Sequence, residues 1–148
     1  MDTKFFDDIS LGEDFVCPHY DVPAEELLEF NRKWDKLPIH LNEHAALAAG
    51  HRAVIASGQY TLCIKQYFVN AMPWSSCVIG AIGFDDLRFL GPVYGGDRIS
   101  MTIECIDKRE SRSKPDRGIV KFAMKMTNQD QQPILSYIDI VMLKKRAT

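Results

Sequence analysis

The sequence predicts an α+β domain in which an antiparallel sheet wraps around one long central helix. Three observations support this prediction. Helical spacing of apolar residues is confined to the first half of the chain, and strict alternation of apolar and polar residues dominates after Pro73. The last helical segment is apolar around most of its circumference, with only Gln59, Gln66 and Asn70 forming a thin polar stripe. Such a helix needs cover on most sides, and a curved sheet can supply it.

Three helices are expected in the first half. Pro23 suits a first helical position and opens a helix that we expect to end near Lys33, with Leu27, Phe30 and Trp34 at helical spacing. Asn42 is a good cap for a short second helix that ends at Gly50, where the left-handed conformation is readily adopted. The third, central helix begins near Ala56–Ser57 and continues to about Met72, because Pro73 stops it.

The second half predicts strands joined by tight turns. A strand that ends near Leu90 is followed by the breakers Gly91–Pro92 and Gly95–Gly96–Asp97. Two half-exposed strands then follow, and a turn at residues 128–132 leads into a last strand over residues 134–143. The apolar positions that alternate in the two half-exposed strands are Ile99, Met101, Ile103 and Cys105, and then Val120, Phe122, Met124 and Met126.

Size and charge restrict the classes of function. The chain has 148 residues, of which 46% are hydrophobic and 26% charged, and this fits a single domain over residues 1–148. The net charge of -2 gives no electrostatic reason to bind nucleic acid or an anionic membrane. The basic run from Lys108 to Arg117 is interrupted by acids and turn residues, which is typical of a solvated hairpin loop. Small molecules and other proteins are therefore the expected partners.

The cysteines and the N-terminus favour a cytoplasmic location. No Cys-x-x-Cys pair is present, and each cysteine sits in or beside an apolar run, as small buried hydrophobes do. The four are Cys17, Cys63, Cys77 and Cys105. The N-terminus has no secretory pattern, and the longest apolar run, Tyr60 to Met72, is too short to span a bilayer.

The candidate chemistry lies in Trp34-Asp35-Lys36-Leu37-Pro38-Ile39-His40 and in Ser57-Gly58 further along. Pro38 cannot continue a helix, so we expect it to bend the chain and bring Asp35 and His40 onto one small volume. If the free N–H groups at Ser57–Gly58 face the same volume, they polarise a carbonyl oxygen while the pair handles a water. This suggests chemistry on an acyl group. Taken alone, the same residues also fit a solvated acid at a helix end and a packed turn histidine.

Four stretches resemble the MaoC-like dehydratases of the hotdog fold, which include the (R)-specific enoyl-CoA hydratases. The family signature Gly-Asp-x-Asn-Pro-(aliphatic)-His is matched at Asp35, Pro38, Ile39 and His40. The family's Ile-Ala-His-Gly at the start of the central helix corresponds to residues 55–58, Ile-Ala-Ser-Gly. Residues 87–97 and 127–130 resemble the family's strand-and-turn segment and its last hairpin, so the resemblance covers nearly the whole chain in order.

The resemblance implies a lyase that interconverts a trans-2-enoyl thioester and a 3-hydroxyacyl thioester by adding or removing water. Asp35 and His40 would be the catalytic pair, the Gly58 N–H the oxyanion donor, and Ser57 a hydroxyl near the substrate or a helix cap. The acyl group would be carried on coenzyme A or an acyl carrier protein, with no metal or redox cofactor. Family members of this length form dimers with strands joined edge to edge, so a homodimer or higher homo-oligomer is expected.

Three family positions differ here, because Trp34 replaces Gly, Leu37 replaces Asn and Ser57 replaces His. Two alternative functions therefore stay open: a thioesterase, since the fold also hydrolyses thioesters, and a noncatalytic subunit that binds acyl thioesters. A metal site at His40, His44 and His51 is disfavoured, because Pro38 and Asn42 place His40 before the second helix. Asp85–Asp86 is expected to be a surface charge pattern, since adjacent strand residues point to opposite faces.

Overall fold

The computed structural model describes residues 2–148. The helices are η1 (Phe6–Asp8), α1 (Ala24–Trp34), α2 (Pro38–Leu41), α3 (Glu43–Ala48), α4 (Gly58–Asn70) and η2 (Ser75–Cys77). The strands are β1 (Asp14–Val16), β2 (Tyr20–Asp21), β3 (Val78–Phe89), β4 (Arg98–Glu110), β5 (Arg117–Thr127) and β6 (Pro133–Lys144). The three predicted helices and the four predicted strands are all present, with bounds that differ by a few residues.

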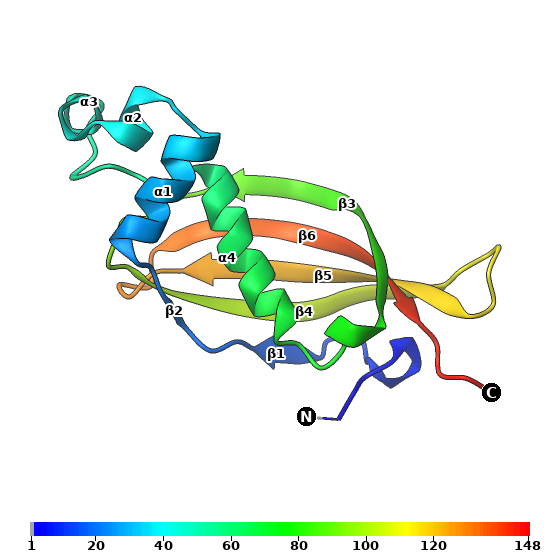
Figure 1. The fold of residues 1–148 in the computed structure, drawn as a ribbon. Helices are drawn as coiled ribbons and strands as arrows, with labels where there is room; N and C mark the ends of the chain where they lie inside the picture. Colours follow the sequence, from blue (N-terminus) through cyan, green and yellow to red (C-terminus); the bar gives the residue numbers. More distant parts are fainter. Residues whose placement is uncertain (1) are drawn as a thin grey trace.

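The strands form one antiparallel sheet in the order β1-β4-β5-β6-β3, and β2 pairs with β4 off this path. The central helix α4 lies across one face of this curved sheet, while α1, α2 and α3 gather near its N-terminal end (Figure 1). The predicted α+β class and the hotdog arrangement are confirmed. β3 forms one edge of the sheet, and its outer side pairs with no strand among residues 2–148.

The core lies between α4 and the inner face of the sheet. The alternating residues predicted for the middle strands are all buried, as are Ile64 and Phe68 on the facing side of α4. At the end of the core opposite α1, the rings of Trp74 and Phe122 stack with centroids 4.4 Å apart, and Phe15 meets both rings edge on. Because each of these strands buries one face and exposes the other, apolar and polar residues alternate along its sequence.

Three expectations about burial were wrong. The central helix buries only the side that faces the sheet, so its apolar residues Cys63 and Tyr67 are exposed. Cys63 is therefore not a core residue, unlike Cys17, Cys77 and Cys105. Trp34, expected on the apolar face of the first helix, is 66% exposed at its C-terminal end.

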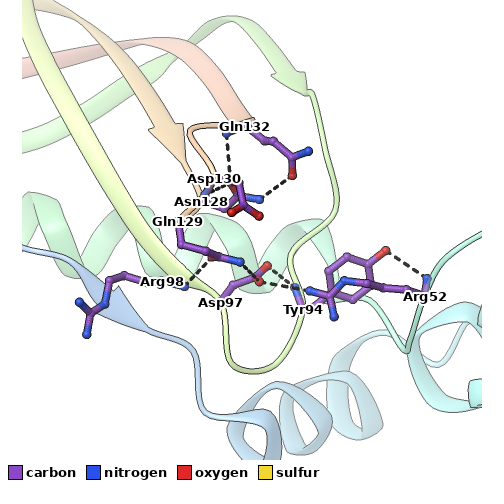
Figure 2. A network of polar contacts seen from close by, with 8 residues as sticks. All are labelled: Arg52, Tyr94, Asp97, Arg98, Asn128, Gln129, Asp130 and Gln132. Atoms are coloured by element: carbon purple, nitrogen blue, oxygen red, sulfur yellow. Dashed lines mark hydrogen bonds and ion pairs between the residues drawn. The ribbon is translucent and has the colours of Figure 1, made fainter.

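The loop that leads into α4 is held by a polar network around Asp97, a residue that is 2% exposed (Figure 2). One Asp97 oxygen accepts from the Tyr94 N–H at 2.9 Å, and the other accepts from Gln129 Nε2 at 3.0 Å. The Arg52 guanidinium lies 3.4 Å from Asp97 and 3.9 Å above the Tyr94 ring. The Ala56 N–H donates to the Val93 carbonyl at 2.8 Å. The predicted hairpin turn and the Gly-Gly-Asp turn thus fix the residues just before Ser57.

Within residues 2–148, none of the helices combines the length and the apolar character needed to cross a bilayer.

Candidate active site

The segment between α1 and α3 has a different local structure from the predicted bend. The α1 helix ends at Trp34, and Asp35 leaves it with an extended backbone (φ -143°, ψ 90°). Pro38 does not break a helix here; it is the first residue of the short helix α2, which contains His40. Proline is tolerated in a first helical turn because its missing N–H would have no partner there. The extended residues before Pro38 therefore turn the chain, and α2 directs the imidazole back toward Asp35.

Asp35 and His40 are in direct contact, as the sequence analysis expected. His40 Nε2 lies 3.3 Å from Asp35 Oδ2, and the side chains are 7% and 22% exposed. His40 Nδ1 lies 2.9 Å from the Ile55 carbonyl oxygen. Because a carbonyl only accepts, Nδ1 carries a hydrogen and Nε2 is the nitrogen free to exchange a proton. A proton shared between His40 Nε2 and Asp35 Oδ2 stabilises this contact. The pair is therefore suited to exchange protons with a neighbouring group.

Ser57 caps α4, which was one of the two roles considered for it, and it also contacts Asp35, which was not predicted. Its hydroxyl donates to Asp35 Oδ2 at 2.7 Å, and the same oxygen accepts from the Gln59 N–H at 3.2 Å as the cap of α4. Ser57 is fully buried, so both bonds are shielded from water. Leu37, which stands where the family has Asn, is 57% exposed and brings no polar group to the pair. The Ser57 hydroxyl thus supplies a polar contact that orients Asp35 Oδ2.

Gly58 is the first residue of α4, and its N–H has no acceptor within the described part of the chain. A Cβ atom at this position would lie 2.9 Å from two atoms of the Phe89 ring, closer than real contacts allow. The glycine therefore lets the Phe89 ring pack directly against the first turn of α4. An unpaired N–H at a helix N-terminus carries partial positive charge and suits a developing oxyanion.

One cavity of about 450 Å³ connects these groups. Asp35, His40, Ser57 and Gly58 all line it, together with the segment 89–93. The structure therefore brings the four predicted site residues together at one cavity. The volume of this cavity is within the range of small-ligand pockets. His51 also lines this cavity, a position that the sequence had suggested only as part of a disfavoured metal site.

Asn31 is a positioning residue that the sequence analysis missed. It is fully buried, and its Nδ2 donates to the carbonyl oxygens of His40 at 2.9 Å and Ile55 at 3.1 Å. Its Oδ1 accepts from the Ser57 N–H at 3.1 Å. One amide thus joins α1, α2 and the start of α4 next to Asp35 and His40. The signal was present, since Asn31 lies four residues after Leu27 on the buried stripe of the helix.

Comparison with known proteins matches the description "MaoC like domain" to residues 11–125. A MaoC-like dehydratase from Rhodospirillum rubrum has a TM-score of 0.90 and 25% identity, covering 98% of this chain and 99% of that one. A Mycobacterium tuberculosis protein described as a double hotdog fold has a TM-score of 0.85 and 18% identity, covering 97% of this chain and 45% of that one. An (R)-hydratase from A. caviae involved in PHA biosynthesis has a TM-score of 0.73 and 20% identity, covering 91% and 97%.

The family model spans well over half of the chain, and the fold agrees with these structures along nearly its full length. The chain belongs to the family of MaoC-like dehydratase domains.

Proposed function

We propose that this protein is a hydratase or dehydratase that interconverts a trans-2-enoyl thioester and a 3-hydroxyacyl thioester. The observation that carries the proposal is the contact of Asp35 Oδ2 with His40 Nε2, 3.3 Å apart, in the cavity that Gly58 also lines. Membership of the MaoC-like family and the likeness to the (R)-hydratase from A. caviae support it.

In the hydration direction, the pair holds a water that adds to the β-carbon of the enoyl group. Asp35 takes a proton from the water while the water oxygen bonds to the β-carbon. The electron pair of the double bond moves toward the thioester oxygen. His40 Nε2 gives its proton to the α-carbon. The proton on Asp35 then returns to His40 through their direct contact. One water is consumed, no group leaves, and the thioester stays intact.

The Gly58 N–H is the donor for the enolate-like oxygen that forms in this step. It is the first N–H of α4 and has no acceptor within residues 2–148, so its dipole is already in place. A preorganised donor of this kind typically contributes about a hundredfold to a thousandfold in kcat.

The active form in this proposal is a homodimer joined through the outer edge of β3. Ile79, Ile82, Phe84 and Phe89 of this edge strand are all exposed large hydrophobics. Long apolar edge strands are normally covered, because their unpaired N–H and C=O groups recruit another strand. Since Phe89 also lines the cavity, the partner subunit would complete one wall of the site, with the pantetheine arm between subunits.

The test follows one crotonyl thioester, carried on coenzyme A and on an acyl carrier protein, by two readouts at once. Loss of the conjugated enoyl absorbance without free thiol is the expected result. Free thiol released with the same kinetics would instead identify a thioesterase, which the same pair and helix terminus can also serve. Saturable binding with neither change would identify a noncatalytic acyl-binding subunit.

A further inference from the structure

A second cavity, of about 280 Å³, lies beside the C-terminal half of α4 and contains two buried charged residues. Lys65 of α4 is 6% exposed and Asp139 of β6 is 3% exposed. The Lys65 ammonium lies 4.8 Å from the centre of the Phe84 ring and 5.8 Å from that of Tyr137. Charged residues are almost never this buried unless they are paired, so the pair calls for an explanation.

The two charges are incompletely satisfied by the described residues. Asp139 Oδ1 is buried with no hydrogen-bond partner among residues 2–148. Lys65 Nζ donates one hydrogen bond, to Gln66 Oε1 at 3.2 Å, and none of the ion pairs among residues 2–148 includes Lys65 or Asp139. Burial raises the pKa of Asp139 and lowers the pKa of Lys65, and in each case the charge of the other residue opposes the effect. A polar group that both donates and accepts would satisfy the two sites together.

The second cavity lies further along α4 than the first. Gly58, Thr61 and Lys65 follow one another at spacings of three and four residues, so they share one face of α4. Gly58 and Thr61 line the first cavity, and Lys65 lines the second. β3 borders both, with Phe89 in the first and Phe84 in the second.

The spacing sets the length of chain that would reach Lys65. Lys65 lies seven residues after Gly58 in α4, which is a rise of about 10 Å. An extended chain advances about 1.2 Å per bond, so an acyl group of about ten carbons covers this distance.

We propose that Lys65 and Asp139 form a polar subsite that recognises a hydroxyl group at the far end of the acyl chain. The hydroxyl hydrogen goes to Asp139, and its oxygen accepts from Lys65. A carboxylate in this place would repel Asp139, and an amine would repel Lys65, which is why a neutral hydroxyl fits best. This inference rests on the proposed function, since it uses the thioester bound at Gly58 as its reference point.

The binding test uses two saturated thioesters that cannot react, decanoyl-CoA and ω-hydroxydecanoyl-CoA, in titration calorimetry. The wild-type protein is expected to bind the hydroxylated thioester about ten- to a hundredfold more tightly, because hydrogen bonds to buried charged groups are discriminating. The double variant Lys65→Met/Asp139→Leu is expected to lose or reverse this preference. It replaces both charges by apolar groups of similar size, so neither charge is left buried alone.

Two further variants keep the test interpretable. Lys125→Met removes an exposed lysine of β5 and is expected to keep the wild-type preference. Asp139→Asn keeps the shape of the side chain and is expected to reduce the preference, should the double variant fail to fold. Equal affinities of the two thioesters for the wild type, or a preference that survives in the folded double variant and in Asp139→Asn, would overturn the subsite. Failure of both thioesters to bind would overturn it as well.

Crotonyl-CoA separates this inference from the proposed function. Its short chain does not reach Lys65, so its turnover is expected to be the same in the wild type and in the folded double variant. Absence of turnover together with an intact hydroxyl preference would refute the proposed reaction and leave the subsite standing. Normal turnover with no hydroxyl preference would refute the subsite alone.

Discussion

Replacing Asn31 by alanine tests whether the buried amide holds the proposed catalytic pair, Asp35 and His40, in place. The substitution removes all three of its hydrogen bonds, to the carbonyls of His40 and Ile55 and from the Ser57 N–H. The Ile55 carbonyl keeps the His40 ring as a partner, so two buried backbone groups are left unsatisfied. Each costs about 1–3 kcal/mol, and we expect a total loss of about 3 kcal/mol in the free energy of unfolding.

Urea unfolding measures this loss directly. With a denaturant slope of about 2 kcal/mol per molar, the midpoint should fall by about 1.5 M. The matched control is Asn70→Ala, because Asn70 is an exposed asparagine of α4 whose side chain accepts one bond from Gln66. That substitution should change the free energy by less than about 0.5 kcal/mol.

The same variant should also lose activity beyond any loss of folded protein. A misplacement of about 1 Å in a catalytic constellation costs about a hundredfold in rate, so kcat for a crotonyl thioester should fall by about that factor in the folded variant. The KM should change little, because the Gly58 N–H and the cavity walls remain. An Asn31→Ala protein that unfolds at the same urea concentration as Asn70→Ala and keeps the wild-type kcat would refute the positioning role.

Three other predictions concern separate parts of the structure. Gly58→Ala should lower kcat/KM by about tenfold or more without lowering Tm, because its Cβ would lie 2.9 Å from the Phe89 ring and displace it in the cavity wall. Phe89→Leu in the same chain should restore part of the loss, and an unaffected kcat/KM would argue against a role for the close contact of Gly58 with Phe89. The unfolding free energy of Asp139→Asn, relative to that of the wild type, should increase as pH rises above about 4. Burial raises the pKa of Asp139 from 3.8, so its ionisation removes stability from the wild type and not from the variant. Urea unfolding of both proteins at acidic and neutral pH measures this, and a difference independent of pH would contradict it. Ile82→Lys, on the exposed edge strand β3, should convert a dimeric wild type to a monomer in light scattering at micromolar concentration, and a wild type that is already monomeric would reject the dimer.

The elements that the sequence predicted well are those whose pattern is set locally. β4, β5 and β6 each bury one face of the sheet, so residues such as Met101 and Phe122 alternate with polar neighbours. The Asn42 side chain caps α3 by accepting from the Ala45 N–H, and Gly50 adopts φ +93° just after that helix. These signals depend on backbone geometry within a few residues, so they are visible in the sequence.

The features that the sequence missed depend on distant partners. β1 and β2 exist because both pair with β4, and segments this short carry no period of their own. The exposure of Cys63 and Trp34 follows from which side of each helix the rest of the fold covers, which composition alone does not fix. Asn31 bonds to groups up to 26 residues away, so its role emerges only once three helices meet.

For the site, the sequence predicted which residues lie together, but it did not predict the hydrogen bonds between them. The motif at Asp35 and His40 predicted the pair, and the pair is in contact. The Ser57 hydroxyl on Asp35 and the opening of α2 at Pro38 were not predicted, because both depend on the folded positions of α2 and α4.

The most direct test of the central claim compares Asp35→Asn and His40→Ala with the wild type on a crotonyl thioester. Each purified variant should lose at least about a hundredfold to ten thousandfold of the hydration rate, because each removes a proton-transfer partner. Both should keep a cooperative unfolding transition, and Asp35→Asn should keep the wild-type affinity for decanoyl-CoA. Wild-type hydration rates in both folded variants would contradict the account.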